Sequence, residues 1–127
     1  MEAKRAAAEA ALKTIPEPEH EAAIGIESFG AVELRVAEIL ECEPVPKAKK
    51  LLKLSVDLGY EKRQVVSGIA KFYKPEELIG KKVALVTNLK PVKLCGVDSY
   101  GMILASGEED VRVLFLDPSA KCGDRIH

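Results

Sequence analysis

The chain is built from short apolar segments, each long enough for one strand and each followed by turn residues. Leu51–Leu58 is the clearest, because every second residue from Leu52 to Val56 is apolar and the residues between them are polar. This alternation is typical of a strand with one buried and one solvated face. Segments of this kind predict a small β structure.

The other predicted elements follow the same reasoning. Val32–Glu41 alternates but breaks step at Ile39–Leu40, which predicts a long strand with a β-bulge. One short helix is predicted within Lys71–Gly80, because Pro75 suits a first helical turn and Gly80 suits a C-terminal cap. The remaining strands are predicted at Arg63–Ile69, Lys82–Thr87, Gly101–Ala105 and Val111–Leu116.

Five or six short strands with one helix after the third describe a Greek-key β-barrel, and the OB-fold has this order. The predicted fold class is therefore all-β, an OB-fold with one short helix. OB-folds bind oligonucleotides on the face of strands 2 and 3 and on the loops joining strands 1–2 and 4–5. In this chain those loops would be Pro44–Lys50 and Asn88–Tyr100, and both are basic.

The chain of 127 residues is expected to form one domain with an appendage. Residues 26–127 are predicted to be the OB-fold domain, and residues 1–25 a helical extension and acidic linker. Glu2–Thr14 is rich in strong helix formers, whereas Ile15–Gly25 contains prolines and acids. No apolar run is long enough for a membrane span, and no signal peptide is recognisable.

Charge is distributed unevenly along the chain, although the formal net charge is only −1. Residues 47–93 contain 12 Lys/Arg against 4 Asp/Glu, whereas residues 1–46 contain 4 against 10. This asymmetry favours a basic patch that an anionic partner would bind. The alternative is an ordinary solvated surface with paired charges.

No pattern typical of catalysis or of cofactor binding is present. There is no paired-carboxylate, activated-nucleophile or phosphate-loop motif, and the serines at 67 and 99 have no histidine nearby in sequence. The cysteines at 42, 95 and 122 are widely spaced without Cys-x-x-Cys, so we expect no metal site and no disulfide framework. The chain is expected not to be an enzyme and to work in a reducing cytoplasm.

Binding of a folded RNA fits the residues better, because lysines neutralise phosphates without reading sequence. Aromatic residues for base stacking are sparse in the basic half. Phe72 and Tyr73 are expected to pack in the core, whereas Tyr100 is equally suited to either role. Met102 is expected to be a core residue under the basic loop.

A long spaced pattern then resembles a known family. Its members are Arg35-Val36, Ala48-x-Lys50-Leu51, Val56-Asp57-x-Gly59, Arg63–Ile69, Pro75-Glu76-Glu77-Leu78-x-Gly80-Lys81, Asn88-Leu89-Lys90-Pro91-x-Lys93-Leu94-x-Gly96 and Ser99-x-Gly101-Met102. From about Ile26 to His127 the chain looks like the tRNA-binding domain family. That domain occurs at the C-terminus of many bacterial methionyl-tRNA synthetases, as a free-standing tRNA-binding protein, and in eukaryotic synthetase cofactors.

The resemblance implies an OB-fold that binds tRNA by shape, assists a synthetase in cis or in trans, and in bacterial forms is a homodimer. Lysines and Arg63 would contact phosphates, Asn88 and Ser99 would shape the 4–5 loop and donate hydrogen bonds, and Arg35 would either pair with a strand neighbour or contact RNA. The expected tRNA-binding residues are Arg35, Lys50, Lys53, Arg63, Ser67, Asn88, Lys90, Lys93 and Ser99.

The chain also departs from the family pattern. Lys49 stands where an acid is usual, Cys95 where an arginine is common, and Tyr100 where glutamine or glutamate often precedes the Gly-Met pair. Two alternative functions remain open: a dimeric peptide-binding chaperone of the same fold family, linked to export, and a module that only dimerises its synthetase.

Overall fold

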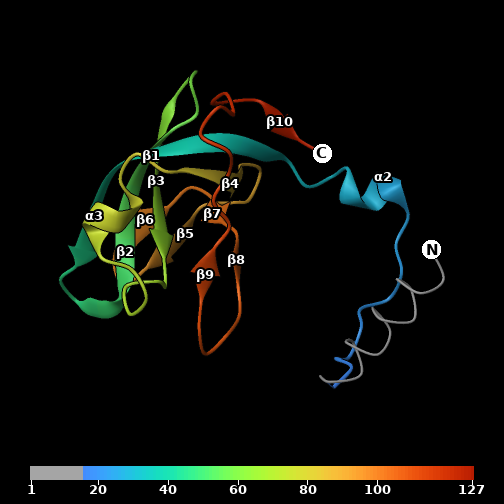
Figure 1. Cartoon of the computed structure of the whole chain (residues 1–127), viewed down its shortest axis with the longest axis horizontal. Helices are drawn as coiled ribbons and strands as arrows, with labels where there is room; N and C mark the ends of the chain where they lie inside the picture. The colour runs from blue at the N-terminus through green and yellow to red at the C-terminus, as the bar shows by residue number, and fades with distance from the viewer. Residues whose placement is uncertain (1–15) are drawn as a thin grey trace, which may run out of the picture.

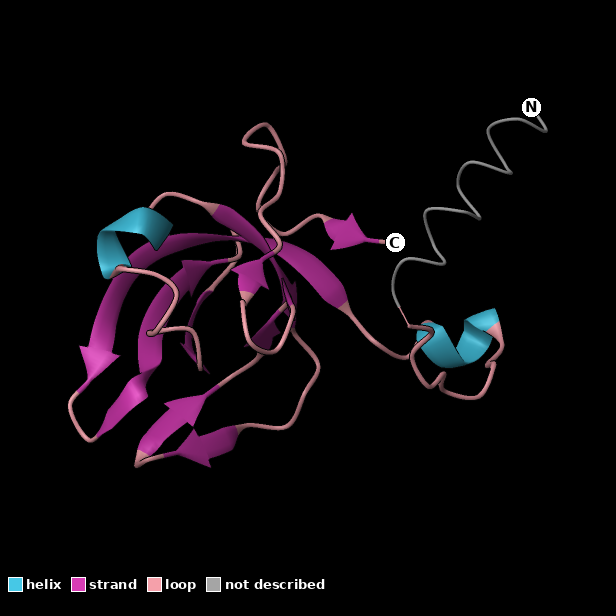
Figure 2. Cartoon of the chain, turned by 60° about the horizontal axis from the view of Figure 1, so that its bottom comes forward, coloured by secondary structure: helices cyan, strands magenta, loops and turns pink. Residues whose placement is uncertain are grey.

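A computed structural model describes residues 16–127 of the chain (Figure 1). The helix predicted over Glu2–Thr14 lies outside the described residues. A short helix, α2 (Ile26–Phe29), precedes the barrel, has no buried residue and stands apart from the strands (Figure 2). The division into residues 1–25 and 26–127 stays a prediction.

The barrel is one curved antiparallel sheet in the order β3-β2-β1-β4-β7, and a terminal strand, β10, also pairs with β1. Two small hairpins, β5–β6 and β8–β9, lie off this sheet. The all-β OB-fold predicted from the sequence is confirmed. The strands are β1 (Leu34–Val45), β2 (Ala48–Asp57), β3 (Lys62–Ser67), β4 (Lys82–Val86), β5 (Val92–Leu94), β6 (Val97–Ser99), β7 (Met102–Ile103), β8 (Ala105–Ser106), β9 (Arg112–Val113) and β10 (Arg125–Ile126).

The long strand β1 bends the sheet. Its first half pairs with β4 and its second half with β2, and the register shifts between Ile39 and Glu41. This shift confirms the predicted bulge, which arises because Ile39 is fully buried and Leu40 is only partly buried. A strand bent in this way lets one sheet curl round a core.

Every second side chain along β2 points inward, and these side chains help to fill the barrel interior. Leu54, Val56 and Val65 of β2 and β3 are fully buried, as is Leu85 of β4. The helix α3 (Pro75–Leu78) covers one end of this core with the fully buried Leu78. Pro75 starts the helix as predicted, and Gly80, with φ 85°, follows the C-cap.

Two aromatic residues, Phe72 and Tyr73, precede α3. Tyr73 packs against the core, as predicted, and its hydroxyl accepts a hydrogen bond from the Val113 amide at 3.0 Å. Phe72 is half-buried. No helix within residues 16–127 has both the length and the apolar character to cross a membrane.

Four of the predicted boundaries are wrong. The predicted loop Pro44–Lys50 is a hairpin whose turn is only Pro46–Lys47, and the predicted loop Asn88–Tyr100 contains β5 and β6. The strand expected at Gly101–Ala105 is divided between β7 and β8. The strand expected at Val111–Leu116 is short because the chain changes its hydrogen-bond partner. The Leu114 amide donates to Leu104 O, whereas the Leu116 amide donates to Lys82 O.

Met102 is also not a core residue. Its side chain is 48% exposed, whereas that of Ile103 is 6% exposed. Adjacent residues of a strand point to opposite faces, so the inward position of Ile103 directs Met102 outward.

Candidate nucleic-acid interface

The β1–β2 hairpin presents the first group of lysines. Its tip is anchored by Val45, which is 5% exposed, and Lys47, Lys49 and Lys50 around the turn are all exposed. Lys53 points outward further along β2 and forms an ion pair with Glu43 at 2.5 Å, because these two residues are cross-strand partners. Lys53 is therefore partly neutralised, whereas the lysines of the tip are not.

The β5–β6 hairpin presents the second group. Its two-residue turn is Cys95-Gly96, with φ of 48° and 80°. Two positive φ values are typical of a type I′ turn, whose twist suits the flanking strands. Lys93 on β5 and Lys90 just before it are exposed.

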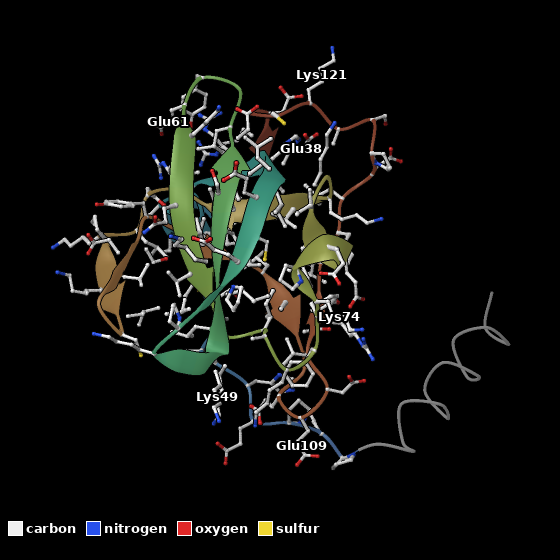
Figure 3. The ribbon with its side chains drawn as sticks, turned by 90° about the vertical axis from the view of Figure 1, so that its left-hand side faces the viewer. Glu38, Lys49, Glu61, Lys74, Glu109 and Lys121 are labelled. Atoms are coloured by element: carbon white, nitrogen blue, oxygen red, sulfur yellow. The ribbon has the colours of Figure 1, made fainter. Side chains whose placement is uncertain are left out.

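The two hairpins are neighbours. A small cavity of about 210 Å³ is lined by Glu43 to Pro46 and Lys53 of the first hairpin and by Val97 of the second. Figure 3 shows the β5–β6 hairpin at the left and Lys49 of the β1–β2 hairpin below it, whereas Lys74 and Lys121 lie elsewhere. Within residues 16–127, Lys50, Lys90 and Lys93 form no ion pair. These side chains are available to an anionic partner.

Arg63 is occupied within the protein. Its guanidinium donates hydrogen bonds to the carbonyl oxygens of Thr87 at 2.6 Å and Tyr100 at 3.3 Å, and it pairs with Glu61 at 2.8 Å. The structure therefore places Arg63 as a clamp between β3 and the two ends of the segment that contains the β5–β6 hairpin. Its contact with phosphate stays a prediction.

Side chains also bridge the open seam of the barrel between β3 and β6. Ser99 is 5% exposed; its hydroxyl accepts a hydrogen bond from the Val66 amide and donates one to Gly101 O, both at 3.0 Å. Gln64 Nε2 donates to Asp98 O at 2.8 Å. Ser99 thus shapes the loop from a position shielded from solvent, and its role in binding tRNA stays a prediction.

Asn88 fixes the start of the 4–5 loop to the chain entering the barrel. Its side chain accepts a hydrogen bond from the Glu33 amide at 2.9 Å and donates one to Ala31 O at 2.5 Å. Arg35 pairs with Glu33 at 3.3 Å and donates to Gly123 O at 2.7 Å. Arg35 therefore pairs with Glu33, the residue just before β1, and its contact with RNA stays a prediction.

Ser67 lies at the end of β3 and is half-buried. It lines an apolar hollow of about 600 Å³ together with Leu89, Lys90, Val92 and Met102. The structure therefore brings Ser67 and Lys90 to one hollow. A role for Ser67 in binding tRNA stays a prediction.

Two sets of residues at this surface were missed or left open at the sequence level. Lys47 and Lys49 are further exposed lysines of the β1–β2 hairpin. The run of basic residues before Leu51 could have identified them from the sequence. Tyr100 is 42% exposed beside Arg63. The sequence left open whether this residue packs in the core or is free to stack on a base. Within residues 16–127 there is no cluster of three or more His, Cys, Asp or Glu side chains arranged to hold a metal ion.

Glu33 gives this region a pH dependence. A hydrogen bond from Thr87 and another from Arg35 hold the pKa of the Glu33 carboxyl below its ordinary 4.5. The ionised carboxylate therefore stabilises the folded state above about pH 4.5, and this contribution is lost as the pH falls through the lowered pKa. We expect Glu33→Gln to lower the melting temperature near neutral pH, with the difference from the parent protein vanishing in acid. A difference that stayed constant with pH would contradict this assignment.

A curled sheet with basic connections at Pro44–Lys50 and Asn88–Tyr100 is typical of an OB-fold. OB-folds of this class present these two connections to oligonucleotides. A family model described as "Putative tRNA binding domain" matches residues 34–125. The chain therefore belongs to the tRNA-binding domain family.

Its relatives include much longer proteins. Over 103 residues the chain is 61% identical to a methionine–tRNA ligase of Methanococcus aeolicus. The matched region covers 81% of this chain and 15% of that ligase. It is 64% identical over 105 residues to the methionine–tRNA ligase of Bacillus subtilis, covering 81% of the chain and 16% of the ligase. The chain thus spans about one sixth of the curated relatives that it matches.

Solved structures share the fold over their whole length. A MetRS related protein from Pyrococcus horikoshii superposes with a TM-score of 0.80 at 37% identity, covering 84% of this chain and 100% of that one. The chaperone CsaA from Bacillus anthracis gives a TM-score of 0.75 at 28% identity, with the same coverage.

Proposed function

We propose that this domain binds tRNA without catalysing a reaction, through phosphate contacts made by the exposed lysines of its two neighbouring hairpins. The observation that carries the proposal is that Lys50, Lys90 and Lys93 are exposed and, within residues 16–127, form no ion pair. Lysines at the 1–2 and 4–5 connections of an OB-fold suit the sugar–phosphate surface of a folded RNA. Family membership supports tRNA as that RNA.

The surface favours recognition by shape. Lysine is a flexible point charge and suits phosphate, whereas base reading needs planar donors such as arginine forks. Arg35 and Arg63, the arginines among the predicted contacts, are engaged with Glu33 and Glu61. Contacts made mainly by lysines would give affinity with little dependence on the tRNA sequence.

The proposed role is to assist aminoacylation by an attached or associated synthetase, in the cytoplasm and as a homodimer. The relatives that share this domain are methionine–tRNA ligases. Tethering raises the local tRNA concentration, so a dissociation constant of about 10⁻⁴–10⁻⁶ M is sufficient. Dimerisation is tested by the dependence of the mass in solution on protein concentration, with and without tRNA.

The salt dependence of binding tests the proposal. If three lysines contact phosphates, the logarithm of the affinity falls linearly with the logarithm of salt concentration, with a slope of about −2 to −3. The measurement is a fluorescence titration of labelled tRNA over a range of potassium chloride concentrations. A slope near zero, or no binding in dilute buffer, would overturn the proposal.

Peptide binding is the second candidate. The hollow of about 600 Å³ gathers exposed apolar side chains, with Leu89 47%, Val92 54% and Met102 48% exposed. The structural similarity to the chaperone CsaA favours this candidate too. Binding of an apolar peptide would depend little on salt, so the same titration with a labelled peptide separates the two functions.

Cys95 offers a footprint of the interface. It is exposed at the tip of the β5–β6 hairpin, whereas burial raises the pKa of Cys42 to about 11 and also raises the pKa of Cys122. A thiol reagent near neutral pH is therefore expected to modify Cys95 first, since thiolate is the reactive form. We expect saturating tRNA to slow this reaction several-fold, as measured by mass spectrometry, with Cys95→Ser as the control. Equal rates with and without tRNA would place the hairpin outside the interface.

A further inference from the structure

A hollow beside Tyr100 is lined by none of the three lysines proposed above to contact phosphates. It has a volume of about 460 Å³ and lies between β3 and the residues flanking the β5–β6 hairpin. This volume is within the roughly 300–1,000 Å³ of typical small-ligand sites. Its walls include Lys62, Gln64, Thr87, Leu89, Pro91 and Tyr100.

One side of the hollow is apolar. The side chain of Tyr100 is 42% exposed and that of Leu89 is 47% exposed, and Pro91 is also at the surface. A half-exposed aromatic ring beside apolar neighbours can accept a second planar ring, which gains stacking and excludes water.

The position of Tyr100 is fixed by the barrel. Its amide donates to Gln64 O at 2.9 Å, and its carbonyl oxygen accepts from Arg63 at 3.3 Å. The residue after it, Gly101, has φ 147°, and a Cβ there would meet Val86 O at 2.9 Å. With its backbone held on both sides, Tyr100 loses less conformational entropy when a ring stacks on it.

The other side of the hollow is polar. Gln64 donates its amide nitrogen to Asp98 O, and within residues 16–127 no hydrogen bond reaches its amide oxygen. Lys62 is exposed, and the described residues give it no acidic partner. The charge of Glu61 is offset by Arg63 at 2.8 Å. The walls of the hollow therefore combine a half-exposed aromatic ring with the polar residue Gln64 and a cation.

We infer that an unpaired nucleobase of the bound RNA stacks on Tyr100 in this hollow, with the adjoining phosphates near Lys62 and Lys90. The inference rests on the proposed RNA binding and adds a site for single-stranded RNA to it. Every base has a flat π-face, so this contact tolerates any sequence but requires an unstacked base from a loop or an end.

Tyr100→Trp provides a direct probe, because the chain has no tryptophan. An oligoadenylate strand is expected to quench the fluorescence of this single tryptophan saturably. An abasic strand of equal length and charge is expected to leave the fluorescence unchanged. Phe115→Trp is the matched control: Phe115 is 41% exposed but does not line the hollow, so oligoadenylate should leave its signal unchanged.

Tyr100→Ala then measures the contribution of stacking. Oligoadenylate binding is expected to weaken by about 5-fold to 150-fold, the range found for losing one base–aromatic stack. Binding of the abasic strand and the melting temperature are expected to remain unchanged, and Tyr100→Phe should bind like the parent protein. Equal affinity of the alanine variant and the parent for oligoadenylate, or an unquenched tryptophan, would overturn the inference.

The design separates the two proposals. If tRNA binding is salt-dependent but Tyr100 variants and the tryptophan probe do not respond, only the nucleobase site is wrong. If the parent protein binds neither tRNA nor oligoadenylate in dilute buffer, the proposed function fails and the nucleobase site fails with it.

Discussion

Replacing Lys90 and Lys93 together by alanine is expected to weaken tRNA binding by about 30-fold. This estimate assigns about 1 kcal/mol to each phosphate contact at a wet surface, with 1.4 kcal/mol equal to a factor of ten. The slope of log affinity against log salt should also become shallower by about 1.4–1.8, because two counterion-releasing contacts are lost. Thermal unfolding should be unchanged, since both side chains are exposed and, within residues 16–127, form no ion pair.

A matched pair controls for net charge. Lys74 and Lys121 are also exposed, and Figure 3 places them away from the β5–β6 hairpin. Lys74→Ala with Lys121→Ala removes the same charge but is expected to change tRNA affinity less than about 3-fold. Salt largely screens the interaction between the tRNA and charges that lie far from it. Equal losses for the two double variants would mean that tRNA responds to overall charge, and the β5–β6 hairpin would not be the contact surface.

The sequence predicted the parts of the fold that depend on local pattern. Leu51–Leu58 has the alternating apolar residues of a half-buried strand, and Lys82–Thr87 has the continuous apolar run of a buried one. The break in alternation at Ile39–Leu40 predicted the bulge. The β5–β6 hairpin was missed because its strands have three residues each and Val92 and Leu94 are exposed. Three residues are too few to establish an alternating apolar period, and the surrounding turn residues favoured a loop.

The candidate site was predictable only in part, for a related reason. Local charge density identified the two lysine-rich connections, but which cations are free depends on tertiary partners. Lys53 meets Glu43 only through the register of β1 and β2. Arg63 finds carbonyl acceptors at Thr87 and Tyr100, 24 and 37 residues away in sequence. No pattern within one segment reveals such partners.

Arg63→Ala is expected to lower the free energy of unfolding by about 2–4 kcal/mol. The guanidinium, with a side chain 24% exposed, joins β3 to Thr87 O at 2.6 Å and Tyr100 O at 3.3 Å. Hydrogen bonds from a charged donor contribute about 1.5–3 kcal/mol each, and removing the donor leaves carbonyl groups without a partner at the seam of the barrel. The measurement is urea unfolding followed by circular dichroism.

Arg63→Lys distinguishes a clamp from a phosphate contact. Lysine keeps the charge but lacks the planar fork that reaches two carbonyl groups at once. If Arg63 is a clamp, the lysine variant is also destabilised, by at least half as much as the alanine variant, whereas its tRNA affinity below the unfolding transition stays near that of the parent protein. If Arg63 instead contacts phosphate, Arg63→Ala unfolds like the parent but binds tRNA with a shallower salt slope, and Arg63→Lys restores binding. Since the fork is already occupied by Glu61 and two backbone carbonyls, the first outcome is the expected one.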